Sequence, residues 1–445
     1  MTENDTIAAI ATPPGTGGVA IIRVSGPDAE KILESLFVPA AKISDSFVSH
    51  KMYYGHVYDQ GEMLDECMAV LMRKPSSYTK EDVAELHLHG GGMTSARVLR
   101  ALTERGVRPA EPGEFTRRAF LNGRIDLSKA EAVMNLIGAN GQTAARAALR
   151  QLSGGASSFI KNIQSALLET LAAIEAAIDY PDEVDDMETA CSIRETCLRL
   201  AGELRRACDI KGAKALENGL SVVLCGAPNA GKSSLLNRLL ERERAIVTDI
   251  PGTTRDIISD TALIGGIRFD FSDTAGIHKT EETVEKIGID LARKAVRGAD
   301  VVLHLIDSSR PLSEEDRMIA EETEKFPHIT VFTKADLPWQ TGPLPTGAVR
   351  ISSLTGDGLD TLKQRLLSFA GKQGETELTQ LRHMYLAQQA AEALEKAAER
   401  CTENIQLDLC SIDLNEALNT LGQITGDSIS EELLNTIFSR FCVGK

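Results

Sequence analysis

The segment GAPNAGKSS at residues 226–234 sets the fold of the middle of this 445-residue chain. Gly226, Gly231, Lys232 and Ser233 have the spacing of a glycine-rich phosphate-binding loop, G-x-x-x-x-G-K-S. The apolar run LSVVLCG leads into the loop and the helical pattern SLLNRLL follows it, which is the strand–loop–helix context that such a loop requires. Backbone N–H groups then contact phosphate oxygens, Lys232 meets the β- and γ-phosphates, and the Ser233 hydroxyl holds Mg²⁺.

The next two sequence motifs predict the part of a nucleotide site that binds the phosphates. In PGTTRD, Thr254 lies where it closes on Mg²⁺, and DTAG at residues 273–276 follows an apolar strand. This spacing places Asp273 beside the metal and Gly276 at the γ-phosphate. Ile277 comes next, where Ras-type GTPases carry the glutamine that orients the attacking water, so another group has to orient it.

The last two boxes predict the base end. Asp336 of TKAD accepts from guanine N1–H and the exocyclic amine, a pattern that adenine does not offer. Thr333 replaces the commoner asparagine, and its shorter hydroxyl weakens one base contact while the selection by Asp336 stays intact. ISSL supplies Ser352 and Ser353 for a loop that covers the base. The five boxes predict a GTPase, and the residues assigned to GTP binding are Asn229, Ala230, Gly231, Lys232, Ser233, Ser234, Thr248, Asp249, Ile250, Pro251, Gly252, Thr253, Thr254, Asp273, Thr274, Ala275, Gly276, Thr333, Lys334, Ala335, Asp336, Ser352 and Ser353.

Asn229, inside the phosphate loop, has two interpretations. Its side-chain carbonyl, with oxygens of TDIPGTT, can bind a monovalent cation that supplies the charge of an arginine finger. Alternatively, the residue serves only the geometry of the loop. The sequence does not separate the two.

The composition predicts a multidomain cytoplasmic protein with no membrane segment. Its length and its apolar fraction of 42% suffice for two or three cores, no run of eighteen apolar residues occurs, and the first residues do not form a secretory signal. Eight cysteines without a C-x-x-C pair indicate neither a disulfide framework nor a zinc site. The net charge of −16 repels nucleic acid on average, so RNA binding requires a local basic surface or a second protein.

The chain divides into regions with three different sequence patterns. Residues 1–120 alternate short β-branched runs with helical stretches, which predicts an α+β domain. Residues 121–213 and 375–445 are helix-rich, whereas residues 214–374 alternate apolar strands with helices, as in a parallel sheet wound with helices. We therefore expect a discontinuous helical domain with the α/β domain inserted into it. One buried helical stripe is expected to contain Ile160, Ile163, Leu167, Leu171, Ile174 and Ile178.

Several longer segments stand in order along the chain: ATPPGTGGVAIIRVSG, EFTRRAFLNGRIDLSKAEAV, GAPNAGKSSLLN, IVTDIPGTTRD, DTAGI with VEKIGI, and the terminal FCVGK. Together they resemble the MnmE family of bacterial tRNA-modification GTPases, also called the TrmE family. The resemblance spans the whole chain. It implies an N-terminal folate-binding domain, a discontinuous helical domain and an inserted Ras-like P-loop G domain.

For the G domain, the resemblance implies a K⁺-activated GTPase whose G domains meet across a homodimer, with K⁺ in place of an arginine finger. Mg²⁺ is then held by Ser233 and Thr254. Glu285 in VEKIGI matches the catalytic glutamate, which orients water through a bridging water; without the resemblance it would be interpreted as an acid on a helix surface. His278 stands where many members have arginine, which leaves its role open. The implied K⁺ ligands are Asn229, Thr248, Ile250 and Thr253.

For the N-terminal domain, the resemblance implies the folate-binding fold of the glycine-cleavage aminomethyltransferases, dimerisation and binding of 5-formyltetrahydrofolate or a related reduced folate. A folate needs a cation for its carboxylates and an acid for its pterin edge. Arg23, Glu85 and Arg124 occupy the matching positions, and Lys445 faces the ligand from the C-terminal tail. Cys442 beside it stays open as a nucleophile.

The function that follows is hydrolysis of GTP in the modification of tRNA. By resemblance, the chain works with the FAD-dependent protein MnmG, as a heterotetramer, and adds an aminomethyl or carboxymethylaminomethyl group to C5 of the wobble uridine. The folate supplies the one-carbon unit, and FAD enters only through the partner. GTP hydrolysis drives association of the G domains.

Other interpretations stay open. A ribosome-assembly or RNA-chaperone GTPase switch would need a basic terminal module or tandem G domains, and neither is visible in the sequence. A lipid-anchored G protein fits poorly because Gly444 and Lys445 do not complete a prenylation signal. His87 and His89 are either a metal pair or ordinary strand residues. The seven arginines between residues 97 and 124 form either a surface for a polyanion or amphipathic helices with charged faces.

Overall fold

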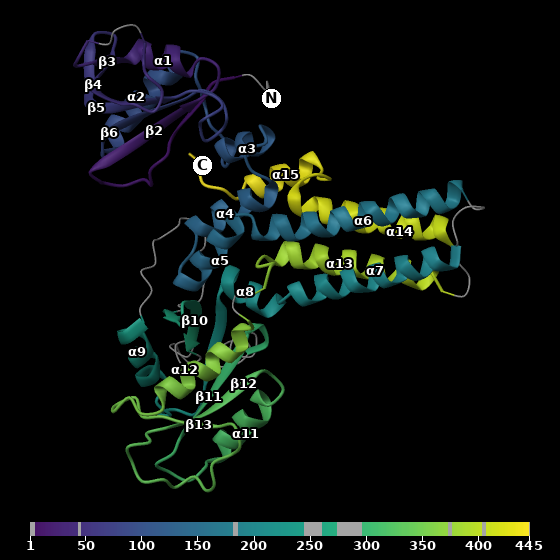
Figure 1. Cartoon of the computed structure of the whole chain (residues 1–445). Helices are drawn as coiled ribbons and strands as arrows, with labels where there is room; N and C mark the ends of the chain where they lie inside the picture. Colours follow the sequence, from purple (N-terminus) through teal and green to yellow (C-terminus); the bar gives the residue numbers. More distant parts are fainter. Residues whose placement is uncertain are drawn as a thin grey trace, which may run out of the picture. The chain divides into compact units, whose positions relative to one another are not determined.

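The computed structural model describes residues 5–42, 46–180, 186–243, 260–273, 296–372, 376–402 and 406–444. They belong to two compact units (Figure 1). One unit comprises Met1–Met134 and Thr425–Lys445, and the other comprises Asn135–Ile424. Within the described residues, no helix is both long and apolar enough to cross a membrane.

The first unit is built on a seven-stranded sheet with the order β3-β4-β5-β6-β2-β1-β7. Neighbouring strands are antiparallel except β1 and β7. Alternate residues of the strands face one apolar core, on which helices α1 and α2 pack (Figure 1). The strands are β1 Ile7–Ile10, β2 Val19–Ser25, β3 Phe37–Pro39, β4 Met52–Asp59, β5 Glu62–Met72, β6 Val83–His89 and β7 Arg108–Pro109. The helices are α1 Ala29–Leu36, α2 Gly92–Glu104, α3 Glu114–Leu121, α4 Leu127–Ile137 and α15 Glu431–Phe438.

A second apolar cluster brings the C-terminal segment into this unit. Leu127 and Ala130 of α4 pack with Leu434, Ile437, Phe438 and Phe441 from α15 and the residues after it. Residues 121–134 and 425–444, which stand at the ends of the expected helical segments, pack with the N-terminal sheet. The physical reason is that α15 buries its apolar side against α4 and α3.

The second unit contains a helical bundle in which α6, α7, α13 and α14 lie side by side around one apolar core (Figure 1). Five residues of the expected stripe on α6 are buried: Ile160, Ile163, Leu167, Leu171 and Ile174. Ile178 is exposed and Ala177 is buried in its place, because the helical period of 3.6 turns the stripe toward the residue at i+3. The helices are α5 Gln142–Leu152, α6 Gly155–Asp179, α7 Asp186–Ala207, α8 Ile210–Asn218, α13 Leu381–Arg400 and α14 Leu407–Thr425.

Between α8 and α13 the chain forms the G domain, a six-stranded sheet with the order β13-β12-β11-β8-β10-β9. All paired strands are parallel except β9 and β10. The carboxyl ends of the parallel strands therefore meet at one edge of the sheet. The strands are β8 Leu220–Cys225, β9 Asp260–Ile264, β10 Ile267–Asp273, β11 Val301–Asp307, β12 His328–Thr333 and β13 Val349–Arg350. The helices are α9 Lys232–Glu243, α11 Glu314–Thr323 and α12 Leu359–Leu367, with a 3₁₀ turn at Ser368–Ala370.

This architecture confirms the expected fold class. The chain has an N-terminal α+β domain, helices on both sides of the insertion, and an inserted α/β domain with a parallel sheet. The buried strands of the G domain are nearly continuous apolar runs, as their coverage on both faces requires.

Candidate functional site

The phosphate loop lies where the sequence predicts it, between the buried strand β8 and helix α9. Gly226 cannot carry a side chain, because a Cβ there would collide with the carbonyl oxygen of Leu305. Gly231 has a φ of 93°, which favours glycine. The two glycines thus allow the tight turn that brings backbone N–H groups toward a phosphate.

Lys232 and Ser233 open helix α9 at this loop. The Lys232 Nζ donates to the carbonyl oxygens of Gly226 at 2.6 Å and of Ala227 at 3.0 Å, so the ammonium group lies inside the loop. The Ser233 Oγ lies 3.5 Å from Oδ2 of Asp273, which ends β10. Strand β10 is paired with β8. The structure therefore brings together the lysine, the hydroxyl and the carboxylate that the sequence assigns to phosphates and Mg²⁺.

At the base end, Asp336 and Ser352 form a hydrogen-bonded pair. The Ser352 Oγ donates to Oδ1 of Asp336 at 2.6 Å. This hydrogen bond is the main cause that lowers the pKa of Asp336, so its carboxylate is ionised at neutral pH and acts as an acceptor only. An exposed ionised carboxylate is what two N–H donors of guanine require.

Thr333 links the base end to the phosphate loop. Its hydroxyl donates to the carbonyl oxygen of Ala230 at 2.7 Å and lies 3.2 Å from that of Ile306. Gly231 packs on the same side chain, since a Cβ there would lie 3.6 Å from it. The hydroxyl is thus directed at the protein backbone, which explains how threonine can occupy a position more often held by asparagine.

Asn229 has a left-handed backbone conformation with a φ of 63°. Asparagine tolerates this conformation better than most residues with a Cβ. Loop geometry is therefore sufficient reason for asparagine at this position, and K⁺ ligation stays a prediction.

Part of the predicted site lies outside the described residues. These positions are Thr248, Asp249, Ile250, Pro251, Gly252, Thr253, Thr254, Thr274, Ala275, Gly276, His278, Glu285 and Lys445.

A second constellation lies in the N-terminal unit, on paired strands. Arg23 of β2 and Glu85 of β6 are cross-strand partners, and the Arg23 Nε donates to Oε1 of Glu85 at 2.8 Å. His87 contributes a second contact to Glu85 at 3.3 Å. Burial raises the pKa of Glu85, but the contacts with His87 and Arg23 outweigh it and lower the pKa overall. The acid and the cation expected for a folate are therefore adjacent and charged.

Two aromatic rings complete this second constellation, and no sequence motif points to either of them. The Arg23 guanidinium lies 5.2 Å from the ring centroid of Tyr78 and 5.7 Å from that of Phe115, and the Arg124 guanidinium lies 4.7 Å from Tyr78. Arg23 and Arg124 thus share one tyrosine ring, and Arg23 also holds Glu85. The Arg23 Nη1 is buried and has no hydrogen-bond partner in the described part of the chain.

The C-terminal tail packs against the same sheet. The backbone N–H of Gly113 donates to the carbonyl oxygen of Cys442 at 3.3 Å. Gly444, with a φ of 94°, is so close to β1 that a Cβ would lie 2.5 Å from the carbonyl oxygen of Ile10. Because Ala9 of β1 is paired with Arg23, the tail ends near the strand that carries the arginine. The Cys442 side chain is exposed.

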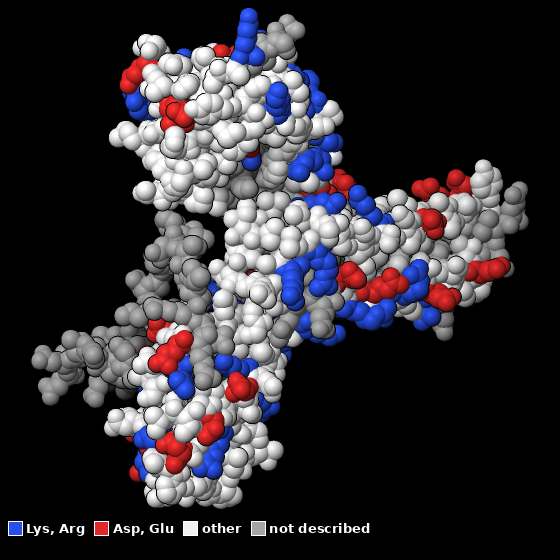
Figure 2. Space-filling view, turned by 60° about the vertical axis from the view of Figure 1, so that its left-hand side comes forward, with Lys and Arg blue, Asp and Glu red and all other residues white. Residues whose placement is uncertain are grey.

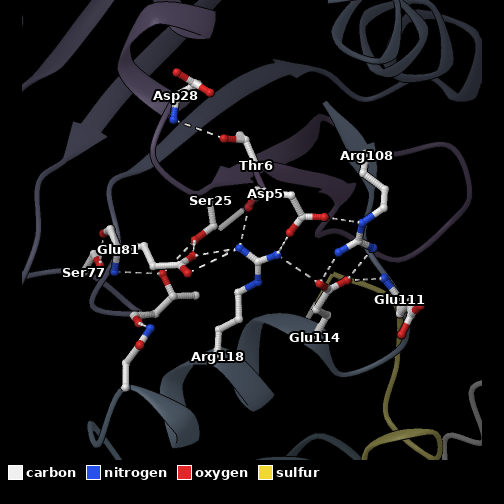
Figure 3. A network of polar contacts seen from close by, with 12 residues as sticks. Asp5, Thr6, Ser25, Asp28, Ser77, Glu81, Arg108, Glu111, Glu114 and Arg118 are labelled. Carbon is white, nitrogen blue, oxygen red and sulfur yellow. Dashed lines mark hydrogen bonds and ion pairs between the residues drawn. The ribbon is translucent and has the colours of Figure 1, made fainter. Parts of the chain in front are cut away.

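A network of charges holds helix α3 on this unit, and Figure 3 shows Arg118 at its centre. The Arg118 guanidinium contacts Asp5 at 2.5 Å, Glu114 at 3.1 Å and Glu81 at 3.2 Å. Arg108 contacts Glu114 and Asp5 as well. These contacts fix the helix that carries Phe115.

The same ion pairs decide how the arginine-rich segment is interpreted. Carboxylates pair with six of its seven arginines: Arg97, Arg100, Arg105, Arg108, Arg117 and Arg118. Arg124 instead stacks on Tyr78. The segment is therefore a set of paired charges, which favours the second interpretation over a surface for a polyanion.

His87 and His89 also have partners of their own. His87 contacts Glu85, and His89 contacts Asp65 at 2.8 Å through Nδ1. Hydrogen bonding to Asp65 raises the pKa of His89. Within the described ranges, no group of three or more metal-ligating side chains forms. The interpretation as ordinary strand residues fits these contacts.

The chain is similar in sequence to known proteins over its whole length. The family model of the MnmE helical domain matches residues 127–442, and the model of the GTP-binding protein TrmE N-terminus matches residues 6–124. The tRNA modification GTPase MnmE of Listeria welshimeri is 42% identical over 459 residues, with 100% of both chains covered. The protein of the same name from Lactiplantibacillus plantarum is 41% identical over 462 residues and covers 100% of this chain and 99% of its own. Among solved structures, the G domain of the T. maritima FeoB iron transporter is 27% identical, covers 34% of this chain and 98% of its own, and has a TM-score of 0.26.

Proposed function

The chain belongs to the MnmE family of tRNA modification GTPases, and from this we propose that it modifies C5 of the wobble uridine with a one-carbon unit from a reduced folate. The observation that carries the proposal is the ion pair of Arg23 with Glu85, together with the stacking of Arg23 and Arg124 on Tyr78. GTP hydrolysis takes place in the G domain, where the phosphate loop and Asp336 lie at one edge of the sheet.

The G-domain residues fit the ions that we propose. The proposed Mg²⁺ ligands are Ser233 and Thr254, whose hydroxyl oxygens suit this ion, and the carboxylate of Asp273 lies beside Ser233 and would face the metal. The bound Mg²⁺ neutralises charge that develops on the β- and γ-phosphates. For K⁺, the proposed ligands are Asn229, Thr248, Ile250 and Thr253, and Glu285 is proposed to orient the attacking water.

The N-terminal residues offer the charges and the aromatic surface that the proposed folate needs. The Nη1 of Arg23, which has no hydrogen-bond partner among the described residues, is proposed to donate to a ligand carbonyl or carboxylate, and Glu85 to accept from an N–H edge such as that of a pterin. The Tyr78 ring offers a flat apolar surface beside both arginines. Lys445 follows Gly444, whose contact with β1 supports our proposal that the tail reaches the folate.

We further propose a homodimer that works with an MnmG-type FAD protein on tRNA in the cytoplasm. Eight free cysteines support a reducing compartment. On the face shown in Figure 2, Lys and Arg lie interspersed with Asp and Glu along the helical bundle. Such mixed charge supports a division of labour in which the partner provides much of the contact with tRNA.

The decisive experiment is mass spectrometry of tRNA nucleosides from cells that lack the protein and carry a plasmid-borne variant. The intact chain is expected to restore the modified wobble uridine, and Arg23→Ala is expected not to, with GTP turnover unchanged. Arg97→Ala, which breaks an exposed ion pair with Glu62 in the same unit, is the matched control and should restore the nucleoside. If the modification of the wobble uridine is the same in cells with and without the protein, the proposed function is wrong. Reduced-folate binding by the purified chain should weaken on Arg23→Ala and on deletion of Lys445.

Asn229→Gly separates the two roles of Asn229. Glycine adopts the left-handed backbone readily and removes the whole side chain, including the amide, so the change tests ligation while the loop geometry stays allowed. If Asn229 is a K⁺ ligand, GTP turnover in K⁺ falls toward the rate in Na⁺. If turnover of Asn229→Gly keeps its preference for K⁺, the ligand assignment is wrong.

A further inference from the structure

Asp307, at the end of β11, lies beside the base-recognition segment TKAD, and no motif of the sequence singles it out. It is paired in register with Thr333 on the neighbouring strand β12. Its carboxylate is buried, and Oδ2 lies 2.6 Å from the Nζ of Lys334, the second residue of TKAD. Strand order thus brings one buried anion to the cation of the segment that selects the base.

The Asp307 carboxylate is fixed from both sides. Oδ1 accepts from the backbone N–H of Ser309 at 2.9 Å and from its hydroxyl at 2.6 Å, which leaves Oδ2 for Lys334. Burial raises the pKa of Asp307, but the donors from Lys334 and Ser309 outweigh this and lower it overall. The group is therefore a charged, immobile anchor.

Lys334 needs such an anchor because its backbone is strained. Its φ is 57°, a left-handed conformation that residues with a Cβ rarely adopt. The neighbour of Asp307 holds the same turn, since the backbone N–H and the hydroxyl of Ser308 both donate to the carbonyl oxygen of Thr333, at 3.1 and 2.7 Å. Residues 307–309 thus clamp the turn from which Asp336 projects.

We propose that Asp307 is a positioning residue for guanine recognition: it holds the ammonium group of Lys334, so that the alkyl stem of this lysine and the carboxylate of Asp336 stand ready for the base. The inference rests on the GTPase function and deepens it. Asp307 acts through Lys334 and does not touch the nucleotide. Without it, the long lysine side chain and its turn have to be ordered when the nucleotide binds, which weakens binding.

The test uses the full chain with Asp307→Asn, a change that keeps the shape and removes the charge. We expect the Kd for a fluorescent GTP analogue and the KM for GTP to rise about tenfold, while kcat at saturating GTP stays unchanged, because ordering one rotamer-rich side chain costs up to about tenfold in affinity. Asp316→Asn is the matched control. Asp316 is another buried aspartate of the G domain, but its hydrogen bonds and its ion pair join it to Arg310 and Ser313 and not to the segment TKAD. The Kd of Asp316→Asn for the GTP analogue is expected to equal that of the intact chain.

A double-mutant cycle identifies the route of the effect. In a Lys334→Met background, which keeps an unbranched side chain but removes the ammonium group, Asp307→Asn is expected to cause no further loss of affinity. Additive losses, or an unchanged Kd for Asp307→Asn alone, would overturn the inference. Absence of GTP binding by the intact chain would instead overturn the G-domain assignment, so the two failures are distinguishable.

Discussion

His304 offers a quantitative test of the G-domain core. It lies on β11 with 1% of its surface exposed, and its Nε2 has no hydrogen-bond partner within the described residues. Its neighbour across the sheet is Cys225 of β8. Burial lowers the pKa of His304 from 6.5 to about 4, with an opposing contribution from Asp316 and a smaller lowering by His328. The imidazole is therefore neutral in the folded protein at neutral pH.

The magnitude follows from linkage between protonation and folding. Above pH 6.5 the residue is neutral in both the folded and the unfolded state, so it adds no pH dependence. Below that pH the unfolded chain binds a proton that the folded chain does not, and the free energy of unfolding falls. With a folded pKa of about 4, the loss is about 2 kcal/mol at pH 5 and approaches about 3 kcal/mol at lower pH.

Trp339 makes the assay specific to this domain. It is the only tryptophan in the sequence, and its ring packs on Phe332 of β12 with centroids 5.0 Å apart. Urea unfolding followed by Trp339 fluorescence at pH 8 and pH 5 gives the change in free energy. Between pH 8 and pH 5, we expect the free energy of unfolding of His304→Leu to fall by about 2 kcal/mol less than that of the intact chain. The control His328→Leu removes a histidine of the same sheet that contacts the carbonyl oxygen of Phe326 and has only the smaller effect on His304, so most of the pH dependence should remain. If His304→Leu keeps the full pH dependence, burial of this imidazole is not its cause.

Three further outcomes are expected. Thr333→Val keeps the shape but removes the hydroxyl that donates to the phosphate loop, so the Kd for GTP should rise about tenfold, as measured by fluorescence titration. Arg118→Met leaves three carboxylates of the N-terminal unit with one cation fewer and should cost about 3 kcal/mol in hydrogen-exchange protection of β1, whereas Arg100→Met on the exposed side of α2 should cost little. Diamide, which takes two electrons and two protons from a thiol pair, should link Cys401 and Cys410, whose Sγ atoms lie 3.6 Å apart, and mass spectrometry of unreduced peptides should lose this link in Cys401→Ser.

The phosphate loop was predictable because its chemistry is local. Residues 226–234 contain the glycines, the lysine and the hydroxyl within one turn, and the flanking patterns identify the strand and the helix. The partner of Thr333 was not predictable in this way, because Ala230 lies 103 residues earlier in the chain. Asp307 left a weak signal, since a carboxylate at the carboxyl end of a buried strand lies near the ends of the neighbouring strands.

The N-terminal site depends on contacts that no local sequence pattern predicts. Arg23 and Glu85 were assigned by resemblance alone, because their pairing depends on the register of two strands 62 residues apart. Tyr78 lies in a loop without any motif, and only the fold reveals that two guanidinium groups lie over its ring. The apolar pattern of α15 likewise predicts a helix but does not say which unit receives it.

Because residues 425–444 complete the N-terminal unit, the chain is a nested insertion: the G domain interrupts the helical domain, and both interrupt the first unit. During synthesis the N-terminal sheet is made early, yet its cluster around α4 lacks α15 until residues 135–424 have been translated. A ribosome that stalls late would leave Leu127 and Ala130 without the side chains that bury them, even though every GTP-binding residue is already present. Burial of these two side chains therefore requires that the helical domain and the G domain have already been translated.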